Sequence, residues 1–162
     1  MDRPPTHADA ELMLRLYDMR REPRLREARR WFMKSFHVST IEEFQKLCPP
    51  GSEENASYRM VVSYWEMAAS FVNHGILHEE LFFENNQELL FIWERIRELV
   101  PKGRALQKNP KQLFNFEQVA GRFQEWWNRR APDYYSVFST MVRTGALPKP
   151  EPEDLDATRS ND

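Results

Sequence analysis

Apolar residues recur every three or four positions through most of the chain, which is the spacing of an amphipathic α-helix. No segment between turn signals alternates strictly between apolar and polar residues, as a half-buried strand would. We therefore expect an all-α fold, a single-domain helical bundle of six to eight helices. The pattern predicts helices over residues 8–21, 23–36, 41–47, 55–74, 78–85, 87–100, 115–130 and 132–144.

The segment 55–74 is apolar around most of its circumference, and its polar residues fall on one narrow stripe. A helix of this kind needs neighbours on several sides, so we expect it at the centre of the bundle. Gly75 has the position of a left-handed residue that ends the helix in a Schellman-type turn. The polar stripe consists of Arg59, Ser63, Glu66, Ser70 and Asn73.

The helix predicted over residues 87–100 has an apolar stripe and a charged face. Its apolar stripe predicts that it packs directly against the central helix. Its charged residues are predicted to face solvent, and they are Glu94, Arg95, Arg97 and Glu98.

Short motifs predict where other helices begin and end. Ser39 and Glu42 have the spacing of a capping box, in which each side chain bonds to the other's backbone N–H. Asn115 with Gln118 has the same spacing and predicts a second helix start. Residues 104–113 are polar and predict a connector between helices.

The boundaries of the pattern divide the chain into three parts. Residues 1–7 are polar and contain prolines, which predicts a flexible N-terminus. Residues 8–146 form the predicted helical domain. Residues 147–162 are acidic, contain prolines and have almost no apolar residues, which predicts a disordered tail.

The composition is typical of a folded protein with little net charge. The 162 residues are 41% hydrophobic and 13% aromatic, which excludes a disordered chain. The net charge of -2 argues against a protein dedicated to nucleic acid. The single cysteine, Cys48, excludes an intrachain disulfide and fits a reducing compartment. Because no apolar run is long enough for an export signal or a membrane span, we expect a cytoplasmic protein without membrane contact.

Basic residues gather between Arg20 and Lys34. On a helix that begins at Pro23, Arg26, Arg30 and Lys34 share one flank, as residues that contact the phosphates of a nucleic acid do. The alternative is a solvated helix face that pairs with acidic neighbours. We favour this alternative, because the net charge is slightly negative and no DNA-reading motif accompanies the cluster.

A polar pocket between helices is a further hypothesis. Arg29 lies beside the apolar stripe of its helix, where a buried guanidinium needs a carboxylate partner. Glu66, in the middle of the central helix, is the predicted partner. With Ser63 and Ser70, these residues would line a ligand pocket. The alternative, which we favour, is a structural ion pair or a polar stripe that meets water.

The sequence carries no motif that predicts catalysis. Glycine-rich phosphate loops, nucleophile elbows and dinucleotide fingerprints are absent from it. His74 and His78 have a spacing that suits metal ligands, but Gly75 is predicted to end the helix between them. We therefore predict no catalytic residue, no metal and no cofactor.

Three stretches carry a family resemblance: residues 64–67 (YWEM), residues 73–83 (NHGILHEELFF) and residues 91–96 (FIWERI). Together they resemble an uncharacterised bacterial helical family, domain of unknown function 4760, over about residues 55–100. The resemblance implies a bacterial source and an all-helical domain, and it transfers no catalytic residue. His78 stands where the family pattern tends to have an acidic capping residue.

We expect an uncharacterised bacterial cytoplasmic protein that acts without catalysis, as a protein-interaction or regulatory module. The expectation comes from its many tryptophans and phenylalanines without a catalytic constellation, and its partner would be another protein or a second copy. One alternative is nucleic-acid binding through the Arg20–Lys34 cluster. The other is a small-ligand protein or enzyme with a polar pocket around Glu66.

Overall fold

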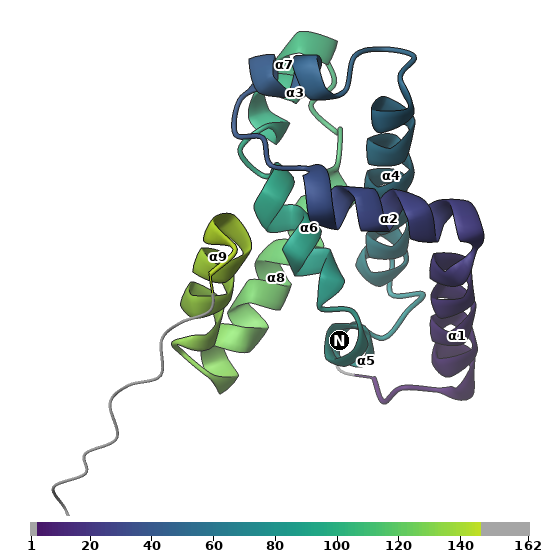
Figure 1. Cartoon of the computed structure of the whole chain (residues 1–162). Helices are drawn as coiled ribbons and strands as arrows, with labels where there is room; N and C mark the ends of the chain where they lie inside the picture. The colour runs from purple at the N-terminus through teal and green to yellow at the C-terminus, as the bar shows by residue number, and fades with distance from the viewer. Residues whose placement is uncertain (1–2, 147–162) are drawn as a thin grey trace, which may run out of the picture.

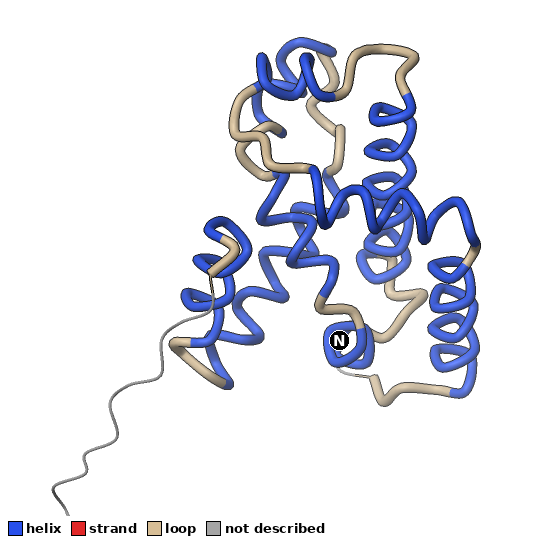
Figure 2. Tube along the Cα trace, viewed as in Figure 1, coloured by secondary structure: helices blue, strands red, loops and turns tan. Residues whose placement is uncertain are grey.

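The structure is a computed structural model of the chain, and it describes residues 3–146 (Figure 1). Within these residues it contains nine helices and no strand, which Figure 2 shows as blue segments joined by loops. The predicted all-α single domain is confirmed, with one helix more than the expected maximum. The helices are α1 (His7–Arg21), α2 (Pro23–Ser35), α3 (Ile41–Leu47), α4 (Glu53–Asn73), α5 (Glu79–Asn85), α6 (Glu88–Ile96), α7 (Val100–Gln107), α8 (Phe114–Arg130) and α9 (Tyr134–Thr144).

The two ends of the chain differ in how far the structure describes them. The predicted acidic tail, residues 147–162, lies outside the described residues. The N-terminal segment, predicted to be flexible, makes hydrogen bonds to the domain through the side chains of Arg3 and Thr6. No helix between residues 3 and 146 combines the length and the apolar character that a bilayer crossing requires.

Helix α4 lies at the centre of the domain, as predicted. It packs mainly against α2 and α8, and Figure 1 shows α2 crossing it. Trp65, Ala68 and Ala69 have no exposed surface. Burial of an aromatic side chain of this size contributes about 2–3 kcal/mol, so this helix anchors the hydrophobic core.

The end of α4 has the predicted Schellman geometry. Gly75 adopts a φ of 67°, which a residue with a β-carbon rarely adopts. The N–H of Ile76 donates to the carbonyl oxygen of Phe71 at 2.9 Å, and the N–H of Gly75 donates to that of Val72 at 3.0 Å. This turn buries Leu77 and redirects the chain into α5.

The helix predicted over residues 87–100 is two helices. Helix α6 ends at Ile96, and α7 begins at Val100 after a turn. Since α7 continues to Gln107, the prediction of a polar connector over residues 104–113 is wrong for its first part. The main neighbours of α6 are α8 and α9, whereas the sequence predicted packing against α4.

Glu94 is buried, although the sequence pattern predicted that it faces solvent. Its side chain has no exposed surface, and it accepts hydrogen bonds from the hydroxyls of Tyr135 and Ser139, the latter at 2.7 Å. Burial of Tyr135, together with its hydrogen bond to Glu94, raises the pKa of its hydroxyl above the ordinary value. The contact attaches α9 to α6 at Glu94.

The capping box of α3 lies one residue later than predicted. Thr40 accepts from the N–H of Glu43 at 3.2 Å, and Glu43 accepts from the N–H of Thr40 at 3.3 Å. The N–H of Ser39 also donates to Glu43, at 2.8 Å. Two overlapping pairs fit the motif in this segment, and the backbone selects the pair that starts at Thr40.

Candidate functional site

The predicted pairing of Arg29 with Glu66 is wrong. The guanidinium of Arg29 donates to both carboxylate oxygens of Glu88, at 2.7 and 2.5 Å. A third hydrogen bond runs from Arg29 to the carbonyl oxygen of Arg20 at 3.1 Å. Arg29 therefore links α2 to the start of α6, and its charge is satisfied there.

Glu66 caps a neighbouring helix. It accepts from the side-chain amide of Asn115 at 2.8 Å and from the N–H of Phe116 at 2.8 Å. Leu113, at the N-cap of α8, has a left-handed φ of 55° and offers no capping side chain. The predicted start of α8 from Asn115 and Gln118 is thus wrong, because a carboxylate from α4 takes the capping role.

Two of the four residues of the hypothesised pocket line the same groove. Ser63 and Ser70 each donate to a carbonyl oxygen of their own helix. Ser63 and Glu66 line an open groove of about 550 Å³, to which Arg29 and Ser70 do not contribute. Because the Glu66 carboxylate already accepts from N–H donors, the pocket hypothesis loses its central ligand-binding group.

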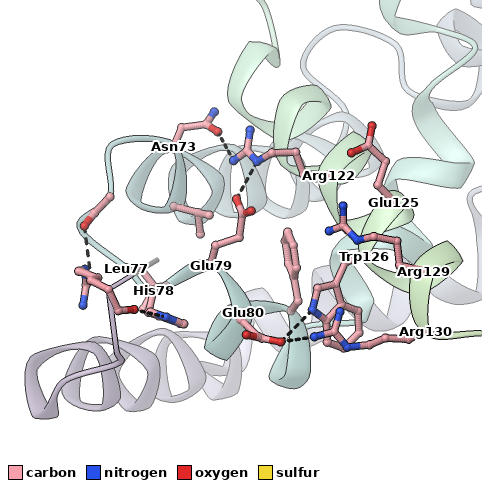
Figure 3. A pocket seen from close by; sticks show the side chains of 14 residues that line it. Asn73, Leu77, His78, Glu79, Glu80, Arg122, Glu125, Trp126, Arg129 and Arg130 are labelled. Atoms are coloured by element: carbon pink, nitrogen blue, oxygen red, sulfur yellow. Dashed lines mark hydrogen bonds and ion pairs between the residues drawn. The ribbon is translucent and has the colours of Figure 1, made fainter. Parts of the chain in front are cut away.

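A larger cleft, of about 870 Å³, lies between the start of α5 and the outer face of α8. Figure 3 shows Glu79 and Glu80 on one side of it, facing arginines and a tryptophan of α8. Its floor includes the apolar side chains of Val72, Leu77 and Phe83. The polar and aromatic lining consists of Arg3, Asn73, His78, Glu79, Glu80, Arg122, Glu125, Trp126, Arg129 and Arg130.

Two ion pairs hold the walls of the cleft together. Arg122 donates to Glu79 at 2.7 Å and to the side-chain oxygen of Asn73 at 2.8 Å. Arg130 pairs with Glu80 and lies over the ring of Trp126, with 4.1 Å from its guanidinium carbon to the ring centroid. These side chains are half exposed, so each pair contributes at most about 1 kcal/mol. Their main effect is to orient the lining side chains.

The N-terminal segment closes one end of the cleft. Arg3 makes two hydrogen bonds of 2.6 Å to the carboxylate of Asp9, which also accepts from the N–H of Thr6 at 2.7 Å and of His78 at 2.8 Å. Arg3, followed by Thr6 and His78, holds the pKa of Asp9 well below its ordinary value.

His78 begins α5, as predicted, and both its ring nitrogens are engaged. Nδ1 accepts from the N–H of Leu81 at 3.1 Å. Nε2 lies 2.7 Å from the carbonyl oxygen of Arg3. This arrangement assigns the proton to Nε2, because only a protonated nitrogen can donate to a carbonyl.

The lining of the cleft offers charge, hydrogen bonds and aromatic surface. It contains no serine, threonine, cysteine, lysine or tyrosine, and so supplies no side-chain nucleophile of those types. Glu125 and Arg129 are exposed and form no ion pair with another described residue. These two side chains can pair with charged groups of a bound molecule.

A family model described as a domain of unknown function, DUF4760, matches residues 5–123. The chain belongs to the DUF4760 family. No curated protein and no solved structure matches it. The match to DUF4760 extends well beyond residues 55–100, and it includes the cleft wall formed by residues 73–83. The arginine-rich end of α8 and all of α9 lie beyond it.

The sequence pattern of this DUF4760 protein did not single out the cleft. Its walls come from segments more than forty positions apart, such as Glu79 and Arg122. One signal was present: Arg122, Arg129 and Arg130 recur at helical spacing on the polar side of α8. That spacing alone is equally typical of a solvated helix face.

Proposed function

We propose that this DUF4760 protein is a non-enzymatic protein-interaction module, and that its cleft receives a segment of a partner protein. The observation that carries the proposal is the open cleft of about 870 Å³, whose charged lining is held in place by ion pairs. Tryptophan and arginine contribute most strongly to protein interfaces, and Trp126 stacked under Arg130 supplies both.

The charges of the cleft that are unpaired within the described residues, Glu125 and Arg129, indicate which charges a partner would carry. Glu125 and Arg129 lie on the same side of α8, one turn apart, and each is available to a partner. The helical rise separates them by about 6 Å along the axis. A segment that carries a basic and an acidic group at a similar separation would complement both.

We place this role in the bacterial cytoplasm. The bacterial source is what the family resemblance implies, and the single cysteine fits a reducing compartment. Burial raises the pKa of the Cys48 thiol to about 11. The thiol therefore stays protonated and serves packing in the core.

A charge swap in the cleft tests this proposal. Glu125→Lys with Arg129→Glu keeps the net charge and removes no ion pair of the described chain, so the protein should fold normally. The matched control swaps Glu11→Lys with Arg15→Glu, a pair with the same spacing on the exposed face of α1. Each full-length protein is used to capture partners from a lysate of its host, and thermal unfolding verifies the fold.

We expect the wild type and the control to capture at least one partner in similar amounts. The amount captured by the cleft swap should be about tenfold lower. Light scattering of the purified protein shows whether that partner is a second copy. The proposal fails if no protein is lost selectively with the cleft swap, or if both swaps lose the same proteins.

A further inference from the structure

The outer face of α2 carries a line of cations, the α2 stripe, formed by Arg26, Arg30 and Lys34. All three side chains are exposed, on the side of α2 opposite the buried Leu25 and Phe32. Successive members are one helical turn apart, which places their attachment points about 6 Å apart along the axis. None of them forms an ion pair with another residue between 3 and 146.

Two other arginines near the stripe, Arg29 and Arg20, differ from it because they have structural partners. Arg29 is held by Glu88, and Arg20 lies over the Trp65 ring, with 5.5 Å to its centroid. Arg122, on α8, is likewise paired with Glu79 of α5. The fold thus leaves the α2 stripe without an internal function.

Few acidic groups oppose the α2 stripe on its own helix. Glu22 caps α2 by accepting from the N–H of Leu25 at 2.9 Å, which leaves Glu27 as the remaining acid there. At the far end, Arg95 of α6 donates to the carbonyl oxygen of Phe36 at 2.7 Å. This places a further guanidinium at the residue that ends α2.

The shape of the α2 stripe distinguishes between kinds of anionic partner. A helix that inserts into a bilayer presents an apolar face to it, whereas the apolar face of α2 is buried in the core. The large apolar side chains that are exposed in the described chain lie outside α2. Evenly spaced cations along one line instead complement a linear array of phosphates.

We propose that the α2 stripe binds the phosphodiester backbone of a nucleic acid without reading its sequence. Three cations contacting three phosphates give a slope of log affinity against log salt of about -2 to -3. The whole chain has a net charge of -2, so this affinity depends on the local stripe. The stripe and the cleft lie on different helices, so this proposal does not rest on the one for the cleft.

Fluorescence anisotropy with short labelled oligonucleotides at low salt tests the proposal. The variant is Arg26→Glu with Arg30→Glu, and the control is Arg15→Glu with Lys102→Glu, which changes the net charge equally at two exposed positions. Single-stranded and duplex forms of RNA and DNA identify which backbone binds. Arg26→Gln with Arg30→Gln replaces the reversal variant if thermal unfolding shows that the latter is not folded.

We expect the variant to lose at least tenfold in affinity and its salt slope to fall by about two, while the control stays within about threefold of the wild type. Equal losses in variant and control would show an effect of net charge alone and overturn the proposal. It is also overturned if the wild type binds no oligonucleotide, or if a parallel binding assay shows that it binds only vesicles that contain phosphatidylserine.

Discussion

Asp9 is a carboxylate at a buried position, with 1% of its surface exposed. Removing a carboxylate from water costs several kcal/mol unless charged or polar partners replace the lost hydration. Arg3, Thr6 and His78 supply those partners. Because these three residues come from the N-terminal segment and the start of α5, one side chain fixes an end of the cleft.

We expect Asp9→Asn to lower the free energy of unfolding at pH 7 by about 2 kcal/mol, since an amide cannot accept from all of these donors. The folded-state pKa of Asp9 is depressed, so its contribution is complete above the unfolded value of about 4 and is lost as the pH falls below that value. The difference between wild type and variant should therefore shrink between about pH 5 and pH 2.

Denaturant unfolding at a series of pH values measures this effect. Asp18→Asn, an exposed carboxylate on the same helix, is the matched control and should change stability by less than about 0.5 kcal/mol. Parallel stability curves for the wild type and Asp9→Asn over the whole pH range would contradict the prediction.

At the scale of elements, helix starts are determined in two ways. Helix α3 is capped by its own Thr40 and Glu43, so its start follows from local sequence. Helix α8 has no capping side chain of its own, and Glu66 of α4 accepts from its first N–H groups. A negative charge at this position also interacts favourably with the helix dipole.

We expect Glu66→Gln to lower the free energy of unfolding by about 1–2 kcal/mol, because it removes the charge and directs an amide towards N–H donors. Hydrogen exchange at the N–H groups of Asn115 and Phe116 should accelerate more than at other positions of α8. The control, Glu84→Gln, alters an exposed glutamate without an ion pair in the described chain. Unchanged exchange at those two positions would mean that Glu66 does not cap α8.

At the scale of the molecule, polar contacts between distant segments decide which helices are neighbours. Arg29 joins α2 to Glu88 across 59 positions of the chain. Glu94 joins α6 to α9 through Tyr135 and Ser139. Since α2 and α8 cover most of α4, helix α6 is left to pack against α8 and α9.

A double-mutant cycle tests the connection between α2 and α6. Arg29→Met and Glu88→Gln should show a coupling energy of about 1–2 kcal/mol, because both side chains are largely buried and share two hydrogen bonds. Arg29→Met combined with Glu66→Gln should instead be additive within about 0.5 kcal/mol. The assignment of Glu88 as the partner would be refuted if Arg29 coupled to Glu66 and not to Glu88.

The sequence by itself determined the helical class, the central position of α4 and the turn at Gly75. Each depends on residues close together in the chain: the repeat of apolar residues, a helix apolar nearly all round, and the backbone freedom of glycine. The exposed line of Arg26, Arg30 and Lys34 also followed from spacing along a single helix.

Only the tertiary structure decided the partners of charged residues. Periodicity placed Arg29 and Glu66 near the core, but it could not say that one bonds Glu88 and the other caps α8. It placed Glu94 on a polar face that α9 then covers. The cleft, too, was decided by the tertiary structure. A carboxylate accepts equally well from any donor within reach, and only the packing of the helices brings particular donors within reach.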